Sequence, residues 1–131
     1  MIVTTDIANI LYKDCKVFGI EVYQSGNIPD EDKELSSERV IIRTKAQSPE
    51  TYWKKGFVEV NICVPDLGGK ANLIRLQELE RKAQEVLDDV VGEYDGSSYY
   101  YSIDSIGTEA DTALKCHYVN VRILFQVLNV N

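Results

Sequence analysis

The spacing of apolar residues in the first half of the chain predicts one short helix followed by strands. Ile7, Ile10 and Leu11 follow candidate N-cap residues at helical spacing, which predicts an amphipathic helix over residues 5–14. Short apolar or alternating stretches predict strands over residues 16–23, 38–44 and 57–64. In the last of these strands the apolar side chains share one face, so we expect that face to be packed.

The second half of the chain has the pattern of a long helix and two more strands. An apolar stripe over residues 73–90 predicts the helix, which Asn72 can cap and Gly92 ends. Residues 97–106 and 114–128 predict strands, and residues 107–112 a hairpin connection between them. This element order predicts a single α+β domain over residues 1–131. We expect two layers, with the long helix packed across a mostly antiparallel sheet of about five strands and a short N-terminal helix beside it.

Composition and charge narrow the class of protein. The chain has 131 residues, 44% of them apolar and 27% charged, which is typical of one globular domain. Its net charge of −7 argues against nucleic-acid binding as the main role, because phosphate contacts require basic surfaces. Three cysteines without a CxxC motif indicate reduced thiols in an intracellular protein. The N-terminus lacks the pattern of a signal peptide, and no apolar run is long enough to cross a bilayer.

Candidate catalytic and metal-binding residues are sparse. His117, the single histidine, lies on the core-facing side of the last predicted strand, where we expect it to be partly buried beside a hydrogen-bond partner. A zinc site formed by His117, Cys63 and Cys116 would lack the paired ligand spacing of structural zinc sites. We therefore expect no catalytic residue, no metal and no cofactor.

A nuclease-like set of acids and a lysine is the remaining enzymatic possibility. Metal-dependent nucleases need clustered carboxylates and a lysine, and Glu59, Asp66 and Lys70 supply these groups. Glu59 and Asp66 differ in strand parity and in setting, which disfavours a shared site. We therefore expect that the protein is not an enzyme.

Three segments suggest surfaces for protein partners. Aromatic residues followed by lysines in a predicted loop are typical of interface hot spots, although the tryptophan could instead fold back onto the core. The acidic segment 30–38 is predicted to be a solvated loop. The tyrosines at 99–101 must occupy both sheet faces, either as a second packing surface with Tyr118 or as ordinary cross-strand pairs. The candidate interface residues are Tyr52, Trp53, Lys54, Lys55, Asp30, Glu31 and Asp32.

The order of segments along nearly the whole chain resembles a known family. The matching segments are residues 7–11, 17–23, 27–29, 40–42, 56–65, 73–90 and 118–127. In this order they resemble the tail terminator, or tail completion, family of long-tailed bacteriophages and prophages. The long loop at 52–55 has no counterpart in that pattern.

The resemblance implies a virion structural protein, assembled in the bacterial cytoplasm, with an α+β fold. Tail terminators form a ring of about six subunits at the head-proximal end of the tail tube, where they stop tube polymerisation and present a surface to the head. The implied partners are further copies of the chain, the tail-tube protein and the head connector. Contacts between copies would use sheet edges, loops and the acidic segment 30–38, which would order on assembly. DNA would pass through the ring without being read.

A different class of function fits the same elements. The chain could be a small α+β module that binds a small molecule or a peptide in a bacterial cell. Its site would be the sheet face that bears Asn61, Cys63, Asn120 and Arg122. Such a module predicts a pocket stabilised by its ligand and a monomer or dimer, whereas the ring protein predicts self-assembly.

Overall fold

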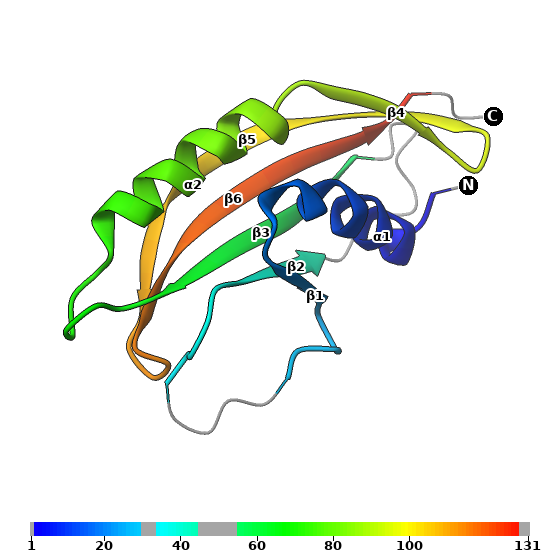
Figure 1. Ribbon diagram of the computed structural model, residues 1–131. Helices are drawn as coiled ribbons and strands as arrows, with labels where there is room; N and C mark the ends of the chain where they lie inside the picture. Colours follow the sequence, from blue (N-terminus) through cyan, green and yellow to red (C-terminus); the bar gives the residue numbers. More distant parts are fainter. Residues whose placement is uncertain (1, 30–33, 45–54, 129–131) are drawn as a thin grey trace.

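The computed structural model describes residues 2–29, 34–44 and 55–128. Within them, two α-helices, a short 3-10 turn and six strands follow one another along the chain (Figure 1). The elements are α1 (Thr4–Asp14), the 3-10 turn η1 (Cys15–Phe18), β1 (Glu21–Gln24), β2 (Arg39–Thr44), β3 (Lys55–Pro65), α2 (Leu73–Val86), β4 (Val90–Tyr94), β5 (Ser97–Asp111) and β6 (Cys116–Val127).

The strands form one curled sheet in the order β1-β2-β3-β6-β5-β4. β1 is parallel to β2, and every other neighbouring pair is antiparallel. The predicted α+β class is therefore confirmed. The described part of the chain has six strands where about five were predicted, and the strand that the pattern missed is β4.

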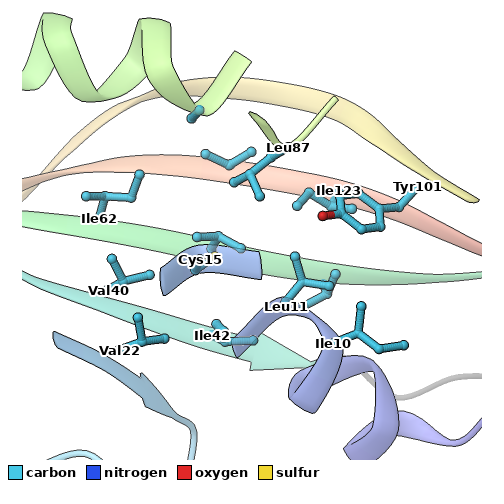
Figure 2. Packing of buried hydrophobic residues seen from close by; sticks show 14 of the residues in the cluster. Ile10, Leu11, Cys15, Val22, Val40, Ile42, Ile62, Leu87, Tyr101 and Ile123 are labelled. Atoms are coloured by element: carbon cyan, nitrogen blue, oxygen red, sulfur yellow. The ribbon is translucent and has the colours of Figure 1, made fainter. Parts of the chain in front are cut away.

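Both helices pack on the same face of the sheet, which makes the domain two-layered (Figure 1). Figure 2 shows Leu11 of α1 and Leu87, just after α2, among core residues of the sheet. Both side chains are fully buried, as are Val40 and Ile123 of the sheet face beneath them. Alternate residues of each central strand supply this core, because successive strand side chains point to opposite faces.

The predicted long helix is shorter than its apolar stripe. The side chain of Asn72 accepts a hydrogen bond from the backbone N–H of Arg75 at 3.3 Å, so the predicted cap is confirmed. The helix ends at Val86, and the left-handed backbone of Asp89 (φ 57°) turns the chain into β4. The extension of the helix to residue 90 was wrong, because the stripe continues into a strand.

Gly92 is a strand residue of β4 and does not end the helix as predicted. It lies opposite Tyr99 of β5, and a β-carbon at this position would overlap the Tyr99 hydroxyl group. The glycine is needed because the Tyr99 ring crosses its backbone closely.

Two further predicted boundaries were wrong. In the predicted strand at 16–23, residues 16–18 continue α1 as the η1 turn, which Gly19 ends with a φ of 69°. Residues 107–111, which were predicted to be a hairpin connection, extend β5, and the turn to β6 lies at residues 112–115. A bulge between Ile103 and Ser105 keeps β5 paired with β6 across its whole length.

Candidate interaction surfaces

Most of the predicted interface residues lie outside the part of the chain that the structure describes. Tyr52, Trp53 and Lys54 fall in one gap, and Asp30, Glu31 and Asp32 fall in the other. Lys55 is described: it begins β3, is exposed, and lies opposite Gln126 of β6. These interface hypotheses therefore stay predictions.

The end of the acidic segment is packed, contrary to the prediction that residues 30–38 form a solvated loop. Leu35 is buried, and its backbone N–H donates to the carbonyl of Leu114 at 2.8 Å. Glu38 accepts two hydrogen bonds from the guanidinium group of Arg75 in α2, at 2.7 and 2.9 Å. One apolar side chain and one bidentate ion pair therefore fix this end of the segment to the domain.

The predicted partner of His117 is present. The Nδ1 atom of His117 lies 2.7 Å from the Oδ1 atom of Asp66, in the loop that follows β3. Both side chains are partly buried, and the pair ties the β3–α2 loop to the start of β6. Glu59 points to the opposite face of the sheet, so Glu59 and Asp66 do not form the nuclease-like set.

The sheet face away from the helices brings together part of the site that a binding module would use. Asn61 of β3 and Asn120 of β6 lie opposite each other, and the Asn120 amide donates to the Asn61 side-chain oxygen at 2.7 Å. Nearby, the guanidinium group of Arg122 lies 4.0 Å from the centre of the Phe57 ring. Asn61 is 8% exposed and Asn120 is half-buried, whereas Arg122 is exposed.

Cys63 lies at the covered end of the same face. It packs with Leu35, Ile41 and Cys116 in a small second core, which Ile28, Leu114 and Tyr118 border. Burial raises the pKa of Cys63, and the nearby positive charge of Arg39 opposes this shift without cancelling it. Burial likewise raises the pKa of Cys116 to about 12, so both thiols are protonated and unreactive near neutral pH.

The tyrosines at 99–101 are split between the two sheet faces, as the strand period requires. The rings of Tyr99 and Tyr101 lie in the core and stack on Phe125 of β6, with centroid distances of 5.1 and 5.9 Å. Tyr100 points to the other face, opposite Gln126, whereas Tyr118 lies eight residues further back along β6. At ~3.4 Å per residue, Tyr100 and Tyr118 are ~27 Å apart and cannot form one surface. The alternative of ordinary cross-strand pairing is confirmed for Tyr101.

One end of the sheet combines an open strand edge with exposed apolar side chains. β4 pairs only with residues 97–101 of β5. From Asp104 to Asp111, β5 pairs with β6 along one edge, and no described strand pairs with its other edge. Above this edge, Leu73 and Ile74 at the start of α2 are 72% and 75% exposed. Together with Gln77 and Thr108 they line an open hollow of about 360 Å³.

The sequence pattern missed this apolar surface. Leu73 was assigned to the buried stripe of α2, but it is exposed, and the buried stripe begins one turn later at Leu76. Ile74 lies outside the apolar stripe of this amphipathic helix. An apolar residue in that position was the feature of the sequence that could have indicated an exposed apolar surface.

The opposite end of the sheet carries a second hollow. Beside the edge strand β1, residues from α1, η1 and β1 surround an open space of about 300 Å³. The ammonium group of Lys16 lies 4.9 Å from the centre of the Tyr12 ring at this hollow. The lining residues are Tyr12, Lys16, Gly19, Ile20, Glu21 and Val22.

Two further structural patterns concern metal sites and membrane-spanning helices. Among the residues that the structure describes, no group of three or more histidine, cysteine or acidic side chains is placed to hold a metal ion. No helix in residues 2–29, 34–44 and 55–128 is long and apolar enough to cross a membrane.

Comparison with known proteins places the fold and leaves the function open. No family model matches this chain, and no curated protein matches it. The chain is similar to a solved structure of a protein that carries no functional name, with a TM-score of 0.63 and 11% sequence identity over 95% of both chains. At that identity the likeness concerns the fold alone.

Proposed function

We propose that this chain is a structural protein of a long-tailed phage or prophage, with the role of a tail terminator. In this role it forms a ring at the head-proximal end of the tail tube, stops tube polymerisation and joins the tail to the head. Its partners are further copies of itself, the tail-tube protein and the head connector. The order of segments along nearly the whole chain, which resembles that family, is the starting point for the proposal.

The observation that supports the proposal best is that the two ends of the sheet carry different surface features. A closed ring needs two unlike surfaces on each subunit, because each copy contacts its neighbours head to tail. One end of this sheet has the open edge of β5 and exposed apolar side chains, and the other end has β1 and a hollow. Both helices lie on one sheet face, and the exposed features at the two ends are available to neighbours in the ring.

The acidic character of the chain is consistent with this role. A net charge of −7 disfavours tight binding to the phosphate backbone. DNA that moves through a ring must not be held there, so an acidic subunit suits passage better than a basic one.

The first experiment is light scattering after size exclusion, over a concentration series with and without magnesium, followed by electron microscopy of the largest species. We expect closed rings of about six subunits. A protein that stays monomeric or dimeric at every concentration and gains thermal stability from a ligand would contradict the proposal and favour a binding module.

The binding module is the second candidate because the structure brings Asn61 and Asn120 together on the outer sheet face, 2.7 Å apart, on the same face as Arg122. These polar groups could orient a small molecule or a peptide. A thermal-shift screen with Asn120→Ala as the control variant tests it: a specific ligand raises the melting temperature of the unmodified chain and leaves that of the variant unchanged.

A further inference from the structure

The two ends of the sheet differ in shape. At the β5 end, the side chains of Leu73 and Ile74 project from the first turn of α2 and are 72% and 75% exposed. At the β1 end, Tyr12, Ile20 and Val22 contribute to an open hollow of about 300 Å³. Leu73 and Ile74 are neighbours, and contiguous exposed apolar side chains mark contact sites better than single ones do; a partly apolar hollow is the kind of surface that receives them.

Both features lie on the same layer of the domain. α2 packs on the sheet face that α1 and η1 also cover, and the hollow lies between that layer and the edge of β1. If β1 of one copy lies beside the open part of β5 of another, the start of α2 in the second copy faces the hollow of the first. Addition of a strand to an open sheet edge is a common mode of protein association.

The charges at the two ends are also complementary. Glu80 lines the hollow beside Ile74 and Thr108 at the β5 end. Lys16 lines the hollow at the β1 end, and the exposed Lys13 precedes it by one helical turn. Glu21 also lines the β1 hollow, so Lys16 is the positive charge of the hollow that Glu80 would meet there.

We propose that one copy of the chain docks through the start of α2 and the open edge of β5 onto the hollow and the β1 edge of the next copy. The contact joins two unlike surfaces, so it repeats from copy to copy in one direction. The closure of the assembly into a ring rests on the proposed function. The contact between neighbouring copies rests on the two surfaces alone.

The test is cross-linking between two forms of the full chain that differ in mass. One form carries Gln77→Cys, beside Ile74, and the other carries Glu21→Cys, at the β1 hollow. A bifunctional thiol reagent joins them, and the native cysteines at 15, 63 and 116 are buried. The matched control replaces Gln77→Cys with Val91→Cys on β4, where the native side chain is 69% exposed.

We expect the Gln77→Cys and Glu21→Cys forms to cross-link about tenfold more than the Val91→Cys control. Adding Ile74→Ser should lower the yield by about tenfold, because burial of one isoleucine side chain contributes that factor to affinity. Lys16→Glu on the Glu21→Cys form should lower it by about fivefold, and Glu80→Lys on its partner should restore it.

Equal yields with the control, or preferential cross-linking of Gln77→Cys to itself, would overturn the inference. Rings that cross-link through other residues would overturn this pair of surfaces and leave the proposed function standing. Cross-linking through this pair into open filaments alone would overturn the proposed function and keep the pair of surfaces.

Discussion

Removal of the Tyr101 hydroxyl group tests how α1 is fixed to the sheet. Tyr101 is fully buried, and its hydroxyl donates a hydrogen bond to the Oδ2 atom of Asp14, the last residue of α1, at 2.6 Å. A hydrogen bond to a charged group contributes about 1.5–3 kcal/mol. Asp14 is only partly buried, so water can replace part of that contact in Tyr101→Phe, and we expect a loss of about 1.5 kcal/mol.

Urea unfolding followed by circular dichroism measures this loss. With a dependence of about 2 kcal/mol per molar urea, the midpoint of Tyr101→Phe should fall by about 0.7 M. Tyr23→Phe is the matched control, because Tyr23 is partly buried and its hydroxyl makes no hydrogen bond to another described residue. Equal midpoints for Tyr101→Phe and Tyr23→Phe would refute the reasoning.

The same hydroxyl group gives the prediction a pH dependence. Burial and the hydrogen bond to Asp14 raise the pKa of Tyr101 above its usual value. The folded state therefore keeps this proton at a pH where the unfolded state has lost it. As a result, the Tyr101 hydroxyl group contributes fully to the free energy of unfolding below about pH 10, and this contribution declines above it. The difference in stability between the unmodified chain and Tyr101→Phe should narrow as the pH rises above about 10.

Three other substitutions test local contacts by the same urea assay. Gly92→Ala should cost about 1–3 kcal/mol, because its β-carbon would overlap Tyr99 and force that stacked ring to move; a neutral result would show that the ring moves freely. Asn72→Ala should cost about 1 kcal/mol through loss of the α2 cap, whereas Asn72→Asp should keep most of that stability. Arg75→Met should cost about 0.5–1 kcal/mol at low salt and less at high salt, since its bond to Glu38 is partly exposed; an effect independent of salt would contradict the ion-pair explanation.

Periodicity predicted the elements whose burial is one-sided. α1, β6 and the first half of β3 bury one face against the core, and their apolar spacing shows it. β2 is different: four consecutive residues are buried and Ile41 belongs to the small second core, so an unbroken apolar run predicted this strand. The end of β5 was missed because its edge is open and Thr108 and Ala110 are exposed there, so the burial alternation fades and the segment has the composition of a turn. The apolar stripe of α2 could not indicate the helix end, because Leu87 is buried just beyond the helix and Val90 already belongs to a strand.

The candidate site was harder to predict than the fold. The His117–Asp66 pair was expected in part, because strand parity placed the histidine on the packed face. The exposed Ile74 surface was not predicted, since exposure at a helix start depends on which other elements cover it, and the spacing of residues within the helix does not show that. Packing of Leu35 was missed because one leucine among acidic residues gives no periodic signal.

The most direct test of the central claim is to locate the protein on phage particles. Phage particles from cells that carry the gene are labelled with a gold-tagged antibody against the full chain and viewed by electron microscopy. We expect the label at the junction between head and tail. Complete particles without label at that junction, or label along the length of the tail tube, would contradict a role as tail terminator.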